Sequence, residues 1–174
     1  MANILDYLEW RGDLTLAQDP FNPVDGLFLC RLAYVPFDGI APGPGAGTVT
    51  IGEAAKTLLA QDTPERRAAV EGLWKGDAEL LAALAASGRF AGMLLEGYVS
   101  ELDPDEEKQF SAFTVRLGDG ARYVAYRGTD STLVGWKEDF NMAFTTPVPA
   151  QRRAVDYLRA RAAEAPGPLW VGGH

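Results

Sequence analysis

The segment best suited to chemistry is the break after the apolar run 123–126, where the sequence continues with Arg127, Gly128, Thr129 and Asp130. Glycine lets a backbone turn without a Cβ penalty, and ligands of α/β sheets bind at the carboxyl ends of strands. Thr129 could offer its N–H and its hydroxyl to one ligand oxygen, which is how a developing oxyanion is stabilised. The alternative is a plain turn in which Thr129 or Asp130 caps the next helix. The local sequence leaves both interpretations open.

A second segment with catalytic character is the end of the sequence, where the apolar run 169–171 leads into Gly172, Gly173 and His174. A nucleophile elbow of the form Gly-X-Ser-X-Gly begins in this way, because its serine occupies a strained turn between a strand and a helix. On this interpretation Gly173 and His174 start the elbow, and the serine itself comes after His174. The alternative is a flexible tail or the remnant of a tag, and the strand-like run favours the elbow.

Several other chemistries are excluded by residue counts. His174 is the only histidine, so neither a Ser-His-Asp nor a Cys-His arrangement can be assembled from this sequence. Metal sites built from histidine and cysteine are excluded for the same reason, and we expect neither a metal nor a cofactor. Cys30 lies in an apolar run and is expected to be a buried structural thiol. The acidic run 103–107 lacks the calcium-loop pattern and is expected to be a solvated turn.

Composition and charge narrow the class of protein further. Hydrophobic residues make up 47% and charged residues 23% of the 174 residues, which is typical of a globular domain. A formal net charge of -8 disfavours nucleic acid and anionic surfaces as partners. The amino terminus has no basic flank, and no apolar stretch approaches the roughly 20 residues that a membrane span needs. These features predict a cytoplasmic protein with no nucleic-acid partner and no membrane span.

The elements that must position these segments fall into two predicted regions. Residues 1–92 are expected to be mainly helical, with a glycine- and proline-rich loop at 36–47. The expected helices run from the cap Asn3 to Gly12, over 24–34, over 51–59, from Pro64 to Gly76 with the stripe Ala69, Val70, Leu73 and Trp74, and from Asp77 to Ser87.

The second region, residues 93–174, is predicted to contain the sheet. Alternating residues predict a strand near 95–99, and the turn 118–120 predicts a hairpin between 112–117 and 123–127. A helix beginning at Pro149 is expected to bury Val155, Leu158 and Ala162, and a strand is expected from Leu169. The order of elements predicts an α/β or α+β architecture, with a parallel strand pair where this helix connects two strands.

The motif around Thr129 resembles a known family pattern. The string 124–130, followed by Trp136 and Asp139, resembles class 3 lipases, in which an apolar strand ends in Arg-Gly-Ser or Arg-Gly-Thr and a Trp and an Asp follow. The chain as a whole resembles a bacterial domain-of-unknown-function family of lipase-like α/β-hydrolases. The matching stretches are 5–14, 20–25, 109–112, 126–144 and 147–151.

This resemblance implies an incomplete α/β-hydrolase fold, with a helical amino-terminal region followed by the first strands of the central sheet. It assigns Thr129 to the oxyanion hole and Asp139 to the carboxylate that holds its loop. It also implies that Gly173 and His174 begin Gly-His-Ser-Lys-Gly, with the catalytic Asp and His on a carboxyl-terminal part that this sequence lacks.

The function expected from these features is that of a serine hydrolase acting on a small ester or related acyl substrate, of which this chain alone would be inactive. Arg127, Gly128 and Asp130 would support the loop, and Trp136 would be either a lid or acyl-site aromatic or a core residue. The alternative function is a non-catalytic binding or interaction module. Because part of the sheet would be uncovered, we also expect self-association through that surface.

Overall fold

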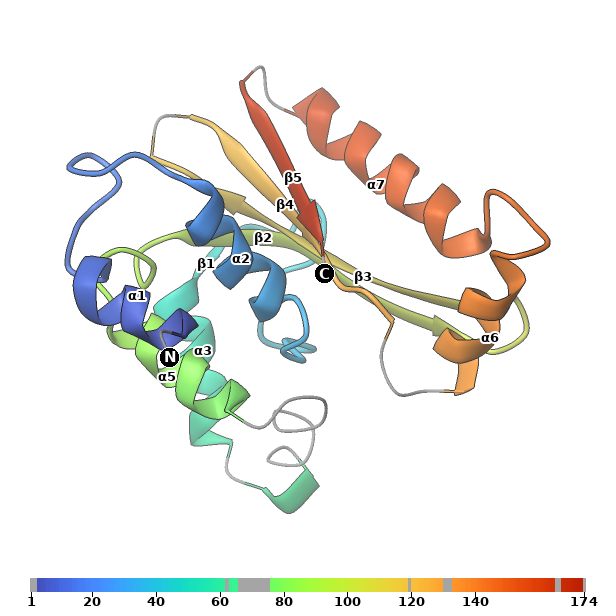
Figure 1. The fold of residues 1–174 in the computed structure, drawn as a ribbon, viewed down its shortest axis with the longest axis horizontal. Helices are drawn as coiled ribbons and strands as arrows, with labels where there is room; N and C mark the ends of the chain where they lie inside the picture. The colour runs from blue at the N-terminus through green and yellow to red at the C-terminus, as the bar shows by residue number, and fades with distance from the viewer. Residues whose placement is uncertain are drawn as a thin grey trace.

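The computed structural model describes residues 3–61, 63–65, 76–118, 120–129, 133–164 and 167–173. In these residues a five-stranded mixed sheet is flanked by six helices, so the predicted α/β class is confirmed in its coarse form. One group of helices lies on one face of the sheet, and α7 lies on the other (Figure 1).

Four amino-terminal helices agree with the sequence prediction. Asn3, Asn22 and Thr50 each cap a helix and form a capping box with an acidic residue three positions later. These reciprocal hydrogen bonds satisfy backbone groups that the first turn leaves unpaired, and so they fix where each helix begins. The four helices are α1 Ile4–Arg11, α2 Pro23–Leu32, α3 Ile51–Ala60 and α5 Asp77–Ala86. Most of the helix predicted between Pro64 and Gly76, including its apolar stripe, lies outside the described residues.

The strands lie in the sheet in the order in which they occur along the chain. Neighbouring strands are antiparallel except for β4 and β5, which are parallel. Both the predicted hairpin, formed by β3 and β4, and the predicted parallel pair are therefore confirmed. The short β1 was not predicted, because two residues are too few to show a period. The strands are β1 Val49–Thr50, β2 Leu94–Asp103, β3 Lys108–Arg116, β4 Arg122–Tyr126 and β5 Leu169–Gly173.

The crossover from β4 to β5 contains two helices, α6 Leu133–Asn141 and α7 Pro149–Glu164. A parallel pair needs such a long connection because the chain must return to the starting edge of the sheet. The sequence predicted α7. It also gave the alternative that Thr129 or Asp130 caps a following helix, without bounds for that helix. It did not predict the extent of α6.

The two faces of the sheet bury different sets of side chains, because successive residues of a strand point to opposite sides. In β3, Phe113 and Val115 pack with α2, α3 and α5, whereas Phe110 and Ala112 pack with Tyr157 of α7. The central strand β3 is thus covered on both faces, whereas Trp170 and Val171 of β5 are each 51% exposed.

The buried face of α7 differs from the prediction. Leu158 is partly buried against the core, as expected, but Val155 is 46% exposed and Ala162 is also exposed. The fully buried side chains are instead Tyr157 and Arg161. Arginine ordinarily indicates a solvated position, but the Arg161 guanidinium pairs with Glu164 at 2.6 Å and lies over the Tyr157 ring. The ion pair and the ring contact offset the cost of burying the charge. The spacing of apolar residues along the helix does not reveal this compensation.

The amino-terminal helices are joined by a fully buried ion pair. Arg89 and Asp25 both have side chains with 0% exposure, and Arg89 Nε donates to Asp25 Oδ1 at 2.6 Å. Arg89 also donates to the carbonyl oxygens of Leu14, Asp19 and Pro20. One guanidinium therefore fixes the loop that joins α1 to α2.

The described helices include none with both the length and the apolar character that crossing a membrane requires.

Candidate functional site

The carboxyl ends of β4 and β5 lie side by side. Figure 1 shows the two strands next to each other. Tyr126, the last residue of β4, is in register with Gly173, the last residue of β5. The backbone of β4 continues its ladder for one more residue, because Arg127 N donates to Ser111 O at 3.0 Å. The two strands therefore end at adjacent positions in the sheet. The structure places Arg127, Gly128, Thr129 and Gly173 at this edge, whereas Asp130 and His174 lie outside the described residues.

Thr129 is joined to α6 by a hydrogen bond. Its hydroxyl donates to Asp139 Oδ1 at 2.8 Å, and both side chains are exposed to solvent. A neutral hydroxyl that donates to an ionised carboxylate forms a stronger bond than two neutral partners would. This bond fixes the Thr129 side chain relative to α6.

Gly135 permits the close approach of the Thr129 loop to α6. A Cβ at this position would lie 2.8 Å from Thr129 Cγ2 and 2.6 Å from Gln109 Oε1. Both separations are shorter than carbon and oxygen atoms tolerate without a shift. The absence of a side chain at 135 is thus part of how the loop and the helix meet.

Glu138, which the sequence did not single out, fixes α6 to the rest of the protein. It is 6% exposed, and its carboxylate accepts hydrogen bonds from Gln109 N at 3.0 Å and from Ala150 N at 2.7 Å. Ala150 lies in the first turn of α7, where a carboxylate is favoured by the helix dipole. Glu138 and Asp139 are adjacent acidic residues with opposite environments, and no local signal in the sequence distinguishes them.

Trp136 lies on α6 and is 68% exposed, so the core alternative for this residue is wrong. Its exposure follows from helical geometry. Glu138 turns inward towards β3 and α7, and Trp136 is two residues away, on nearly the opposite side of the helix.

The glycines at the end of β5 allow that strand to pack closely against its neighbours. A Cβ on Gly172 would lie 1.8 Å from Tyr123 Oη and 2.9 Å from Cys30 Sγ. Cys30 is buried as expected, and burial raises the pKa of its thiol, so the protonated form is favoured. Because residues 169–173 form a paired strand, the flexible-tail alternative is wrong for them.

The tyrosine that ends β4 is not a proton acceptor at neutral pH. Burial raises the pKa of Tyr126 to about 12, and its hydroxyl donates to Ala154 O at 2.9 Å. Within the described part of the chain, no group of three His, Cys, Asp or Glu side chains could hold a metal ion.

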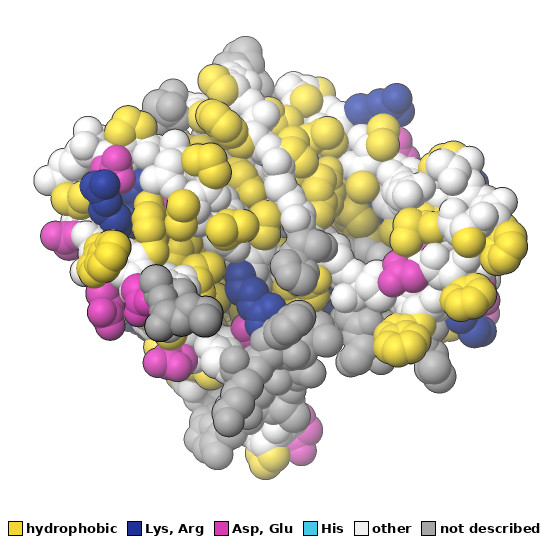
Figure 2. Space-filling view, in the orientation of Figure 1, with side chains coloured by type: hydrophobic (Ala, Val, Ile, Leu, Met, Phe, Trp, Pro, Cys, Tyr) yellow, Lys and Arg dark blue, Asp and Glu magenta, His cyan; other side chains and the backbone are white. Residues whose placement is uncertain are grey.

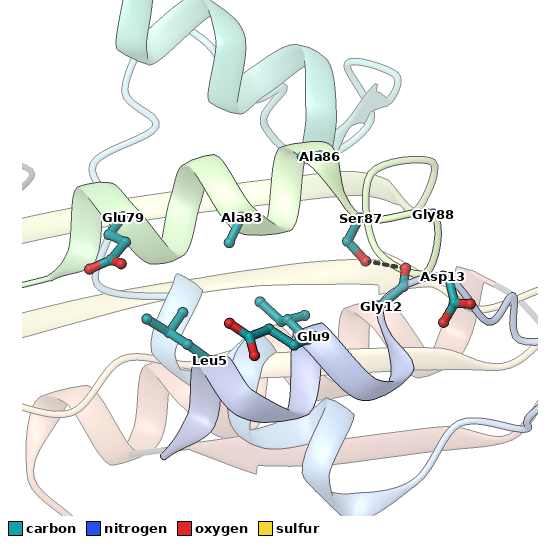
Figure 3. Close-up of a pocket in the computed structure, with 10 residues that line it drawn as sticks. Leu5, Glu9, Gly12, Asp13, Glu79, Ala83, Ala86, Ser87 and Gly88 are labelled. Carbon is teal, nitrogen blue, oxygen red and sulfur yellow. Dashed lines mark hydrogen bonds between the residues drawn. The ribbon is translucent and has the colours of Figure 1, made fainter. Parts of the chain in front are cut away.

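A surface cavity of about 460 Å³ lies elsewhere, between α1 and α5 (Figure 3). Ser87 lies at one end of it, and its hydroxyl donates to Gly12 O at 2.8 Å. Glu9, Asp13 and Glu79 contribute carboxylates to its lining. None of the sequence-predicted site residues lines this cavity, so it is separate from the edge formed by β4 and β5.

Comparison with known protein families overturns the resemblance to lipases. Residues 84–174 match the family described as Mbeg1-like, which is not a lipase-like family, and no lipase or hydrolase family matches. A strand that ends in Arg-Gly-Thr satisfies a local backbone requirement shared by unrelated α/β proteins, so the motif does not identify a family. No curated protein and no solved structure matches the chain. The family match covers slightly more than half of the sequence, and the chain therefore belongs to the Mbeg1-like family.

Proposed function

We propose that the edge formed by β4 and β5 is the oxyanion-binding part of a serine-type hydrolase that acts on an ester or related acyl substrate. The observation that carries this proposal is the hydrogen bond from Thr129 Oγ1 to Asp139 Oδ1 at the carboxyl end of β4. It holds a loop threonine in one orientation, and preorganised donors of this kind stabilise the charge that develops on an acyl carbonyl oxygen.

In this mechanism the Thr129 N–H donates to the carbonyl oxygen as it becomes an oxyanion, and Asp139 positions the donor. Asp139 acts through Thr129, because the threonine hydroxyl donates to its carboxylate. The parallel register supports a nucleophile here, since a residue shortly after Gly173 would leave the sheet beside the Thr129 loop. In this proposal the described sheet is part of an α/β-hydrolase core. The nucleophilic serine, the acid and the base would come from residues outside this sequence.

The proposal is tested by treating the product of the complete gene with a fluorophosphonate probe, which reacts with activated serines. We expect one labelled serine, and mass spectrometry should locate it within a few residues after His174. Labelling elsewhere in the protein, or none at all in a folded sample, would contradict a serine hydrolase site at this edge. If no serine is labelled in a folded sample, the alternative function of a non-catalytic binding module is favoured.

A further inference from the structure

The part of helix α6 that contacts the Thr129 loop is held in place by polar side chains. Among residues 135–141, the only buried side chain is that of Glu138. Trp136 and Phe140 lie on the outer side of the helix and are 68% and 76% exposed, and Figure 2 shows hydrophobic side chains standing out from the surface over α6. The position of this part of the helix therefore depends on a buried carboxylate, where a helix of a globular protein ordinarily buries an apolar stripe.

Glu138 attaches α6 to two other elements at once. Its Oε2 accepts a hydrogen bond from Gln109 N of β3 at 3.0 Å, and its Oε1 accepts one from Ala150 N in the first turn of α7 at 2.7 Å. Each carboxylate oxygen thus serves one backbone N–H. A glutamine in the same place has one acceptor oxygen and an amide group that only donates, so it satisfies one of these N–H groups and leaves the other without an acceptor.

A second carboxylate, that of Glu107 in the turn between β2 and β3, contacts the same helix from the solvent side. Its Oε2 accepts a hydrogen bond from Asn141 Nδ2 at 2.6 Å, and its Oε1 lies 3.4 Å from Lys137 Nζ. Lys137 and Asn141 are four residues apart, so they share one side of α6. Glu107 also has a φ of 48°, a left-handed backbone that a residue other than glycine keeps only where its surroundings stabilise it.

The side of α6 that meets the Thr129 loop lies next to Glu138. Gly135 and Asp139 are four residues apart and share this side, close to Thr129 Cγ2 and to its hydroxyl. Glu138 is rotated by about 100° from Asp139 around the helix, so it faces β3 and α7 while Asp139 faces the loop. The hydrogen bond of 2.8 Å from Thr129 to Asp139 therefore depends on where Glu138 holds the helix.

We propose that Glu138 is a positioning residue for the Thr129 loop, acting through α6 on the hydrogen bond between Thr129 and Asp139, with Glu107 as a weaker support of the same helix. The catalytic consequence rests on the proposed function, whereas the effect on the loop does not. An exposed hydrogen bond competes with water. It keeps one geometry only if the helix that carries its acceptor is itself fixed.

The catalytic test replaces Glu138 by glutamine in the product of the complete gene. We expect kcat for ester hydrolysis to fall about tenfold with KM within about twofold of the original, because one buried N–H loses its acceptor and α6 shifts. Glu107→Ala should lower kcat only about twofold, since its contacts are exposed. Glu106→Gln is the matched control, because Glu106 pairs with Lys108 on the same turn at 3.0 Å, and it should leave kcat unchanged.

A second readout reports on the loop without catalysis. Because Thr129 Cγ2 lies close to Gly135, the NMR signal of an isotope-labelled Thr129 methyl group is sensitive to the contact between the loop and α6. A Thr129→Ser variant, which lacks this methyl group, assigns the signal. We expect Glu138→Gln to shift the signal and Glu106→Gln to leave it in place.

A double variant separates positioning from a merely structural role. If Glu138 acts through the bond between Thr129 and Asp139, its replacement should have little effect once the threonine hydroxyl is gone. The kcat of Thr129→Val combined with Glu138→Gln should therefore be within about twofold of that of Thr129→Val alone. Additive losses would overturn the proposal, because Glu138 would then act by another route.

An unchanged kcat together with an unchanged Thr129 methyl signal in folded Glu138→Gln would also overturn it. If circular dichroism shows that Glu138→Gln does not fold, Glu107→Ala takes its place, and an unchanged methyl signal in that variant then contradicts the control of the loop through α6. If the original protein hydrolyses no ester, the proposed function fails, while the methyl signal still decides whether Glu138 positions the loop.

Discussion

The pair Arg89 and Asp25 and the pair Thr129 and Asp139 use an acidic residue in opposite ways. In the first pair both side chains are fully buried, and the guanidinium also serves three backbone carbonyls. In the second pair both residues are exposed, and the carboxylate accepts a hydrogen bond from the Thr129 hydroxyl. The buried pair is enclosed by protein, so it can act on nothing else. The exposed pair orients a loop that solvent, and therefore a ligand, can reach.

This difference separates the structural requirements of the protein from its proposed chemistry. Changes around the buried pair should lower the free energy of unfolding, whereas changes at Thr129 should lower activity and leave the fold intact.

The largest expected effect is that of Asp25→Asn. The substitution removes the fully buried counter-charge of Arg89 and leaves the Asp19 carboxylate at 3.7 Å as its partner. It should lower the free energy of unfolding by about 3 kcal/mol. Asp139→Asn makes the same chemical change at an exposed position, and it should alter the free energy of unfolding by less than about 0.5 kcal/mol. Urea unfolding followed by circular dichroism compares the two variants. Equal midpoints would contradict the distinction between a structural pair and a positioning pair.

The next effect concerns how closely β5 packs on the face of the sheet that the amino-terminal helices cover. Gly172→Ala places a Cβ against the Tyr123 hydroxyl and Cys30 Sγ, and such overpacking should cost about 1–3 kcal/mol. Gly92→Ala is the control, because a Cβ there meets nothing within 4 Å. Thermal unfolding should show a lower Tm for Gly172→Ala than for Gly92→Ala. If the two Tm values agree, β5 does not pack as closely as its glycines indicate.

Stability should also fall in alkaline solution. Burial raises the pKa of Tyr98, Tyr126 and Tyr157 each to about 12, whereas tyrosine in an unfolded chain titrates near about 10. A raised pKa in the folded state gives stability that is complete below about pH 10 and is lost as the pH rises towards about 12. At about pH 11 the loss should approach about 1 kcal/mol per tyrosine.

Urea unfolding at pH 9 and pH 11 measures this loss. Tyr157→Phe should reduce the difference between the two midpoints, because the variant has one fewer buried hydroxyl to ionise. An unchanged difference would show that Tyr157 does not contribute to it.

Much of the fold could be predicted from the sequence because its signals are local. The cap at Asn3, the turn at 118–120 and the proline at 149 each fix the start or the reversal of an element. The buried face of α7 could not be predicted, since Arg161 becomes compatible with burial only through Glu164 and Tyr157.

The candidate site could be predicted in part. Thr129 stood out because it follows an apolar strand, and Asp139 was connected to it through the resemblance to lipases. The hydrogen bond between them is present although that family assignment is wrong. Glu138 was missed because its partners, Gln109 and Ala150, are distant in the sequence. Contacts of this kind depend on how the crossover folds over the sheet.

The most direct test of the central claim compares Thr129→Val with Thr129→Ser in the product of the complete gene. Valine keeps the size of the side chain but removes the hydroxyl that Asp139 orients, whereas serine retains it. We predict that Thr129→Val lowers kcat for ester hydrolysis about 10- to 100-fold, somewhat less than the loss of an oxyanion donor itself, with KM and the urea midpoint almost unchanged. Thr129→Ser should stay within about threefold of the original kcat, a change of less than about 1 kcal/mol in the barrier. Equal kcat values for the valine variant and the original protein would contradict the assignment of Thr129 to an oxyanion-binding loop.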